Sequence, residues 1–304
     1  MENSESTIYI ASNCDNDYIL FYAVLLKSIE IHHQSPEKIV SYLIGDHISI
    51  ENKLKVEQSL TTNKIEIRWL NGEEFMPAGY KLPNDRSTFP ISIYMNLYLP
   101  HGLSGDIKRI LYLDVDMIVL EDISKLYFMD LGDNILAAAL DRVKVIGEEW
   151  GGILNYKELG LSADLPYFNT GVMLIDTDKW RANFVTQAAI DAIEHNKKYS
   201  FFADQYGLNV VFAQLPWLVL PQKWNHISFE PIKKEKPAII HYVAQKPIHS
   251  HYKGLPEHAA TFFDYLAKTK FKDVQKISKL QWKLKRLKVV LSKIYRNIFN
   301  DFKV

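Results

Sequence analysis

At its centre the chain carries the segment Ile110-Leu111-Tyr112-Leu113-Asp114-Val115-Asp116-Met117-Ile118-Val119-Leu120, an apolar run interrupted by two carboxylates. Alternate side chains of an extended strand point to the same side, so Asp114 and Asp116 share one face. A strand that is apolar on both faces is typical of a sheet covered by helices, where an ionised carboxylate is costly unless a positive partner meets it. A divalent cation would meet both carboxylates, and the pattern alone leaves a turn between two core strands as the alternative.

Length and composition favour one large globular α/β domain. The chain has 304 residues, of which 47% are apolar and 12% aromatic, enough to bury a substantial core. A single cysteine, Cys14, excludes an internal disulfide, and the start Met1-Glu2-Asn3-Ser4-Glu5 has neither the basic nor the apolar part of a secretory signal. No uncharged apolar run approaches the roughly 18 to 20 residues of a membrane-spanning helix. The sequence therefore predicts a cytoplasmic protein.

Segments with strand and helix patterns alternate along the chain, which predicts a mainly parallel sheet flanked by helices. The expected strands are 8–11, 39–44, 65–70, 110–120, 135–140, 172–175, 218–220 and 238–240. The expected helices are 18–32, 50–60, 91–99, 178–195 and 204–212, the third of them stopped by Pro100.

Polar residues follow several of these strands, at the edge where ligands of open α/β sheets collect. There is no G-x-G-x-x-G and no Walker lysine loop, so a phosphate at this edge needs a metal or side chains. The Asp-x-Asp spacing by itself is weak, because it also occurs at 15–17 and at 176–178. The first of these pairs fits a ligand-facing turn, and Asp178 fits the N-cap of the following helix.

The C-terminal segment differs in charge from the rest of the chain. Residues 268–304 contain 12 Lys and Arg against two Asp and Glu, whereas residues 1–267 contain 24 against 34. Apolar residues recur there at helical spacing: Ile277, Leu280, Leu284, Leu287, Leu291, Ile294, Ile298 and Phe302. The pattern predicts a basic amphipathic helix on an anionic membrane surface, with a helix packed against the body as the alternative and nucleic acid a poorer partner.

An ordered set of motifs resembles glycosyltransferase family 8, a family of retaining, metal-dependent enzymes. The motifs are Leu111-Tyr112-Leu113-Asp114-Val115-Asp116, Asp130-Leu131-Gly132-Asp133-Asn134, Tyr167-Phe168-Asn169-Thr170-Gly171-Val172, Asp204-Gln205 and His241-Tyr242. The resemblance covers roughly residues 7 to 250. It implies a GT-A (Rossmann-like) catalytic domain over residues 1–255, which leaves residues 256–304 as a basic helical segment for membrane association.

The resemblance also implies the ligands. A UDP-sugar is expected to bind with its diphosphate on Mn²⁺ or Mg²⁺ held by Asp114, Asp116 and His241, with Val115 beside it and Lys246 adding a positive charge. Two carboxylates and an imidazole suit Mn²⁺. Around the nucleoside we expect Ala11, Ser12, Asn13, Asp15, Asn16 and Tyr18. Around the transferred sugar the family pattern puts Asp141, Asn169, Asp204 and Gln205, of which the last three are the expected catalytic residues.

The expected reaction moves galactose or glucose from a UDP-sugar to a cell-surface glycan or lipid-linked oligosaccharide on the inner face of the cell membrane. Gln205 lies where a nucleophile would be assigned, and its neutral amide is a poor one, which favours same-face substitution. Three departures from the family pattern concern the donor: Asn96 replaces a usual arginine, Ala244 and Ile248 stand near the usual glycine and tryptophan, and Lys246 comes one residue early. His249 and His251 are alternative metal ligands. A catalytically silent binding partner and a haloacid-dehalogenase-like phosphatase are the rival functions.

Overall fold

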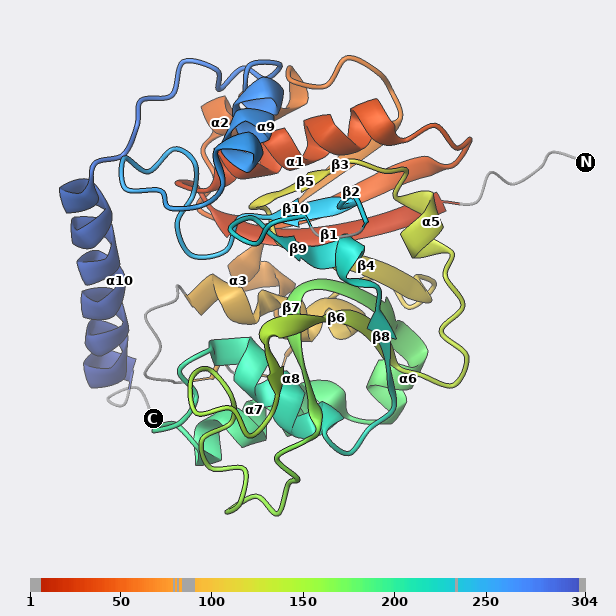
Figure 1. Cartoon of the computed structure of the whole chain (residues 1–304), viewed down its shortest axis with the longest axis vertical. Helices are drawn as coiled ribbons and strands as arrows, with labels where there is room; N and C mark the ends of the chain where they lie inside the picture. Colours follow the sequence, from red (N-terminus) through yellow and green to blue (C-terminus); the bar gives the residue numbers. More distant parts are fainter. Residues whose placement is uncertain (1–6, 79, 81, 84–90, 233–234, 301–304) are drawn as a thin grey trace, which may run out of the picture.

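The computed structural model describes residues 7–78, 80, 82–83, 91–232 and 235–300. Its centre is a seven-stranded sheet in the order β3-β2-β1-β4-β7-β6-β8, in which β7 alone runs against its neighbours (Figure 1). The strands are β1 (Thr7–Asp15), β2 (Lys38–Asp46), β3 (Ile65–Asn71), β4 (Arg109–Leu113), β6 (Leu136–Val145), β7 (Pro166–Asp176) and β8 (Trp217–Leu220). The mainly parallel α/β sheet expected from the sequence is therefore confirmed.

Helices cover both faces of this sheet. They are α1 (Ile19–His32), α2 (Ile50–Glu57), α3 (Gly72–Phe75), α4 (Leu99–Gly102), α5 (Ser124–Tyr127), α6 (Thr177–Ala182), α7 (Val185–His195), α8 (Ala203–Phe212), α9 (Pro256–Leu266) and α10 (Lys279–Asn300), with 3₁₀ helices η1 (Ile91–Tyr98) and η2 (Gln222–Asn225). α1 is buried on nearly all sides, and its Lys27 and Glu30 tolerate burial because they pair with each other at 2.6 Å.

The central apolar run is two strands rather than one. β4 ends at Leu113, and β5 (Met117–Val119) belongs to a second, three-stranded sheet with β10 (Ile239–His241) and β9 (His226–Ile227). At the bend between them, the Asp114 amide donates to the Gly171 carbonyl at 2.8 Å, and the Asp116 carbonyl accepts from the Tyr242 amide at 2.9 Å. The run leaves one sheet and enters the other at the two carboxylates, so the expectation of a continuous strand was wrong.

Two helix predictions also need correction. Residues 91–98 form a 3₁₀ helix, and Pro100 lies in the first turn of α4, where its missing amide costs nothing, instead of stopping a helix. The single helix expected at 178–195 is two helices, because Phe184 adopts a left-handed conformation between them. The N-cap of the first of these helices, α6, is Asp176 and not Asp178: the Asp176 side chain accepts from the Lys179 amide at 2.9 Å.

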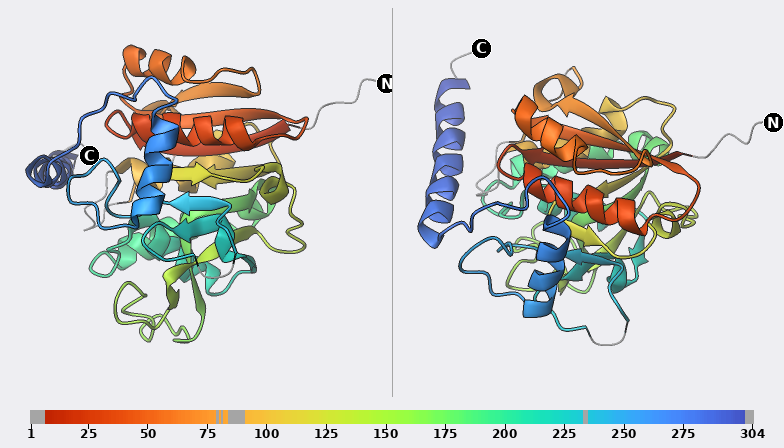
Figure 2. Two further views of the ribbon diagram at one scale, coloured as in Figure 1. Left: turned by 45° about the horizontal axis from the view of Figure 1, so that its top comes forward. Right: turned by 90° about the horizontal axis from the view of Figure 1, so that it is seen from above.

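The C-terminal segment begins packed on the body and ends away from it. α9 lies along α1, where the rings of Phe21 and Phe262 are 5.6 Å apart, whereas α10 stands to one side of the sheet (Figure 2). Four leucines of α10 are exposed: Leu280 at 67%, Leu284 at 51%, Leu287 at 53% and Leu291 at 54%. Phe302 and the side chains of Ile294 and Ile298 lie outside the described part of the chain.

Among the described helices, none joins the length and the apolar composition that a passage through a bilayer requires. α10 has the length but is rich in lysine and arginine, so its apolar residues form a stripe along one side and do not surround it.

Candidate active site

Two carboxylates and one imidazole meet where the two sheets join. Asp114 and Asp116 lie at the bend after β4, and His241 ends β10. His241 Nε2 is 3.3 Å from Asp116 Oδ1 and 3.6 Å from Asp114 Oδ2, and one ligand atom from each residue lies within 4.8 Å of the other two. The structure thus brings together the three residues expected to hold a metal. The turn between two core strands, which the sequence offered as the alternative to a metal site, is present as well, and it positions the two carboxylates.

The hydrogen bonds behind His241 assign its tautomer. Asn225 Nδ2 donates to Asn169 Oδ1 at 2.8 Å, so the Asn225 carbonyl oxygen faces His241 Nδ1, 2.9 Å away, and accepts its proton. In the neutral ring, Nε2 then presents its lone pair to the two carboxylates. Three lone-pair donors that face one another fit a divalent cation between them. A hydrogen bond from the other ring nitrogen, such as that from His241 Nδ1 to Asn225, is usual for metal-binding histidines.

The two carboxylates differ in their electrostatic surroundings. Burial and the neighbouring Asp116 raise the pKa of Asp114, against the opposite influence of His241 and Tyr112. Burial also acts to raise the pKa of Asp116, but the ammonium of Lys246, which pairs directly with it, and His241 hold that pKa well below its usual range. Asp116 is therefore ionised throughout the physiological range.

A glycine makes room for this cluster. A Cβ on Gly171, in the middle of β7, would lie 2.5 Å from the His241 ring and 2.8 Å from Asp114 Oδ2, which is closer than atoms approach. A glycine is therefore needed at this position because two candidate metal ligands pack closely against the strand.

Next to the cluster, an amide and carboxylate network extends along the same edge of the sheet. Asn169 Nδ2 donates to Asp141 Oδ2 at 2.9 Å and to Gln205 Oε1 at 3.1 Å, while Gln205 Nε2 lies 3.3 Å from the same Asp141 oxygen. Because β7 runs antiparallel, its early residue Asn169 reaches the edge where β4 ends. The three residues expected around the sugar therefore lie together.

Asp204, at the start of α8, is buried behind this network with 2% of its surface exposed. Burial raises its pKa to about 7, although the Asn96 side chain donates to Asp204 Oδ2 at 2.6 Å. Asn96, which stands where the family usually has an arginine, is neutral, and its own carbonyl oxygen is buried without a partner among the described residues. A fixed positive charge at position 96 would keep Asp204 ionised, whereas Asn96 carries none.

The expected nucleoside residues surround the turn after β1. Tyr18 packs on Phe21 with ring centroids 5.3 Å apart, and the Lys246 ammonium lies 6.0 Å from its ring centre. Asp15 Oδ1 accepts from the amides of Asp17 and Tyr18, each at 3.0 Å, and so closes the turn before α1. This turn is therefore held in place by its own side chains.

The other residues expected at the nucleoside use their side chains inside the fold. The Ser12 hydroxyl donates to the Leu113 carbonyl at 2.7 Å, while Asn16 Oδ1 accepts from the Ser49 amide at 3.0 Å. Asn13 Nδ2 donates to the Ser92 carbonyl at 2.9 Å. Ala11 and Val115 are buried in the core.

The alternative metal ligands do not join the cluster. His249 and His251 stack on each other with ring centroids 5.4 Å apart and contact Trp282 of α10. His249 Nδ1 accepts from the Lys246 amide at 3.0 Å, which fixes the loop that carries the lysine.

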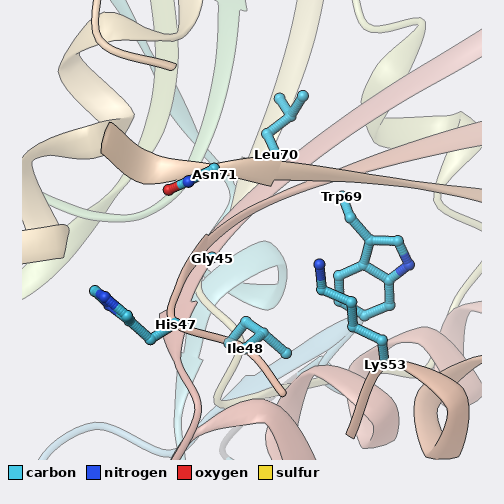
Figure 3. A pocket seen from close by; sticks show the side chains of 7 residues that line it. All are labelled: Gly45, His47, Ile48, Lys53, Trp69, Leu70 and Asn71. Carbon is cyan, nitrogen blue, oxygen red and sulfur yellow. The ribbon is translucent and has the colours of Figure 1, made fainter. Parts of the chain in front are cut away.

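A small hollow of about 160 Å³ lies beyond the nucleoside turn, at the ends of β2 and β3 (Figure 3). Gly45, Ile48 and Trp69 line it, and the Lys53 ammonium lies over the Trp69 ring at 5.5 Å. It is separate from the Asp-Asp-His cluster.

A mainly parallel sheet with an Asp-x-Asp bend beside an inner histidine is the architecture of GT-A glycosyltransferases. The family model described as glycosyl transferase family 8 matches residues 9–254, and the chain belongs to this family. This is a family of glycosyltransferases, and membership of it argues against the phosphatase alternative.

Named relatives and a solved structure agree with this assignment. General stress protein A of Bacillus subtilis (strain 168) is 26% identical over 290 residues, 89% of this chain and 96% of that protein. The lipopolysaccharide 1,2-glucosyltransferase of Escherichia coli is 23% identical over 91% of this chain and 80% of that protein. The structure of galactosyltransferase LgtC, in complex with donor and acceptor sugar analogues, superposes with a TM-score of 0.70 at 26% identity over 86% of this chain and 96% of LgtC.

Sequence reasoning missed Asn225 and Tyr112. Asn225 lies in η2, where a single asparagine in Gln222-Lys223-Trp224-Asn225 gives no pattern to notice. The Tyr112 hydroxyl lies 2.8 Å from Asp114 Oδ1 and 2.9 Å from Asn13 Oδ1, so it joins the bend to β1. Its position two residues before Asp114 was a usable signal, because that spacing puts both side chains on one face.

Proposed function

We propose that this protein is a retaining glycosyltransferase that transfers a hexose, galactose or glucose, from a UDP-sugar to a cell-surface glycan or lipid-linked oligosaccharide. The observation that carries the proposal is the Asp114–Asp116–His241 cluster at the ligand-binding edge of the sheet, next to the amide network of Asn169. Support for sugar substrates comes from LgtC, which was solved with donor and acceptor sugar analogues.

The donor set of the cluster fits Mn²⁺ or Mg²⁺. Asp114 and Asp116 supply hard oxygen ligands, and His241 supplies a nitrogen lone pair that Asn225 orients. When bound, such a cation would act as a Lewis acid that stabilises the negative charge of a departing diphosphate. The buried ammonium of Lys246 is in place to add a second positive charge from the side of Tyr18.

Asn169, Asp141 and Gln205 are proposed to bind the transferred sugar, with Asp204 behind them. The Gln205 amide is held by Asn169 and by the Thr170 backbone amide, 3.3 Å from Gln205 Oε1, so its oxygen is fixed but neutral. A neutral amide stabilises a positively charged sugar better than it attacks one. We therefore propose same-face substitution, in which the leaving phosphate takes the proton of the acceptor hydroxyl.

The C-terminal segment is proposed to hold the enzyme on the inner face of the cell membrane. α10 exposes a row of leucines between lysines and arginines, and this combination has affinity for an anionic bilayer surface. Under this proposal residues 1–255 form the catalytic domain and residues 256–304 the membrane-associated segment, although α9 packs against α1 of the catalytic domain.

The test is a panel of UDP-sugars and other nucleotide-sugars with Mn²⁺, with release of the nucleoside diphosphate as the signal. We expect release from UDP-galactose or UDP-glucose, and loss of that release when a chelator is added. Transfer of the sugar with an inverted anomeric centre would overturn the retaining mechanism. Release from no nucleotide-sugar would overturn the enzymatic proposal in favour of a silent binding partner.

A further inference from the structure

An arginine lies between two aromatic rings at the far end of the site. The Arg142 guanidinium carbon is 4.6 Å from the ring centre of Phe229 and 5.5 Å from that of Trp150. Both distances are in the range of cation–π contacts, which position a guanidinium without using its N–H groups. Trp150 is 66% exposed, so this cluster faces solvent.

Three elements that bring residues to the site also build this cluster. Arg142 follows Asp141 in β6, Phe229 follows β9, which pairs with the strand of His241, and Phe202 caps α8 two residues before Asp204. The rings of Trp150 and Phe202 are 6.3 Å apart, so the loop after β6 meets the start of α8. The cluster therefore borders the sugar end of the site.

The residues of the site form a continuous line of contacts from the nucleoside end to the sugar end. The line begins at Tyr18 and Lys246, passes through Asp116 and His241 to Asn225, and continues through Asn169 to Asp141. With a diphosphate at the metal cluster and its sugar at Asp141, the next group along this line is Arg142. The acceptor has to approach the sugar from a side that the nucleotide does not occupy. We take the Arg142 cluster as that side, because it adjoins Asp141 in β6 and the start of α8.

Among the residues that the structure describes, the Arg142 side chain has no counter-ion and makes no hydrogen bond. Ten other arginine or lysine side chains in this part of the chain pair with carboxylates: Lys27, Lys55, Arg68, Lys108, Lys125, Lys179, Arg181, Lys223, Lys246 and Lys285. All five N–H donors of its planar group are thus available for a ligand. That fork matches the two oxygens of a carboxylate or a phosphate.

We propose that Arg142 binds an oxyanion, a carboxylate or a phosphate, on the acceptor glycan, and that Trp150, Phe202 and Phe229 form the surface on which an acceptor sugar rests. This inference rests on the proposed glycosyl transfer and adds the chemical class of the acceptor. The enzyme is then selective for anionic glycans over neutral ones of the same terminal sugar.

The test is binding of the full-length protein, with Mn²⁺ and UDP present, to an array of neutral, uronate-containing and phosphate-containing oligosaccharides. We expect the retained glycans to be anionic, and Arg142→Gln to weaken their binding at least about tenfold, the size expected for loss of a hydrogen bond between charged groups. Arg142→Lys keeps the charge without the fork and should recover only part of the binding. The matched control is Arg68→Gln, at an exposed arginine of β3 paired with Glu66, which should bind as the wild type does.

The two oxyanions are separate arms of the array: retention of uronates alone identifies a carboxylate, and retention of phosphorylated sugars alone identifies a phosphate. Equal retention of neutral and anionic glycans, no retained anionic glycan, or an unchanged pattern in Arg142→Gln would overturn the inference. UDP release by the wild type is measured separately. A protein that releases UDP and binds neutral and anionic glycans alike keeps the proposed function and loses this inference.

Discussion

The Asp114–Asp116–His241 cluster and helix α10 each violate the usual distribution of polar and apolar groups, in opposite ways. The cluster gathers two carboxylates around a buried histidine: the His241 side chain is 3% exposed, that of Asp116 12% and that of Asp114 36%. α10 puts four leucines in water, each more than half exposed, among lysines and arginines. Ordinary folding stabilises neither arrangement.

The difference between them identifies the kind of partner each region lacks. The cluster is rigid, because Asn225, Gly171, Tyr112 and Lys246 fix its members by hydrogen bonds and close packing. Rigid, convergent ligands suit a small ion of defined coordination. α10 has few contacts with the body, of which one is the ion pair of Lys285 with Asp17 at 2.9 Å. A long, weakly attached, basic stripe suits an extended surface that needs no defined geometry.

Replacement of Asp114 by asparagine should have the largest effect. We expect metal-dependent transfer to fall by about 10³-fold or more, equivalent to about 4 kcal/mol of transition-state stabilisation. In chelator, the free energy of unfolding should stay constant or rise. The charges of Asp114 and Asp116 repel each other, which contributes to the raised pKa of Asp114, and the variant removes this repulsion. Initial rates and urea unfolding measure the two quantities. Asp133→Asn, at an exposed carboxylate, is the control. Full activity of the wild type in chelator would contradict the metal assignment.

Removal of α10 tests the other region. A chain ending at Ser278 should bind anionic vesicles at least about 100-fold more weakly than the full chain, because α10 carries several cations that each add about 1 kcal/mol near such a surface. Turnover of a soluble acceptor should change much less. The charge-preserving variant Leu284→Ser with Leu287→Ser and Leu291→Ser separates the leucines from the charges. Vesicle sedimentation is the measurement, and equal binding of full-length and shortened chains would rule out a role for the helix.

Loss of the Asn225 side chain should weaken metal binding without removing a ligand. Asn225→Ala frees the Nδ1 proton of His241 from its acceptor and takes a donor from Asn169. We expect the Mn²⁺ affinity, measured by titration calorimetry, to fall about 10- to 100-fold, as for other outer-shell partners of metal-binding histidines. Asn63→Ala, at an exposed position before β3, should bind Mn²⁺ like the wild type. An unchanged affinity in Asn225→Ala would show that the orientation of His241 does not depend on this contact.

Most of the sheet was predictable because buried parallel strands have a local sequence pattern. β1, β2 and β3 were expected within a few residues of their bounds, and the β-turn-α order fixes which of their ends carry ligands. The bend at Asp114–Asp116 was not predictable in this way. Apolar residues on both sides of it satisfy the pattern of one long strand as well as that of two, and only the partners Gly171 and Tyr242, distant in sequence, separate the alternatives.

The site was predictable to the extent that its residues stand in motifs. The resemblance to the family supplied Asn169, Asp204 and Gln205, and the structure brings them together, but their catalytic roles stay predictions. Asn225 and the Arg142 cluster had no such signal. Their arrangement arises from loops after β6, β8 and β9 that meet only in the folded chain, so no spacing in the sequence reports it.

The smallest expected effect concerns Asp204, whose charge state depends on Asn96. Burial raises the folded-state pKa of Asp204 to about 7, whereas an unfolded aspartate titrates near 3.9. Between these values the folded chain holds a proton that the unfolded chain releases, so the stability contributed by protonated Asp204 is complete below about pH 4 and is lost as pH rises through about 7. Relative to Asp204→Asn, which cannot titrate, the wild type should lose about 1 kcal/mol of unfolding free energy per pH unit from pH 5 to pH 7. Urea unfolding of both proteins in chelator measures this difference, and parallel stability curves would mean that Asp204 is ionised in the folded chain despite its neutral partner Asn96.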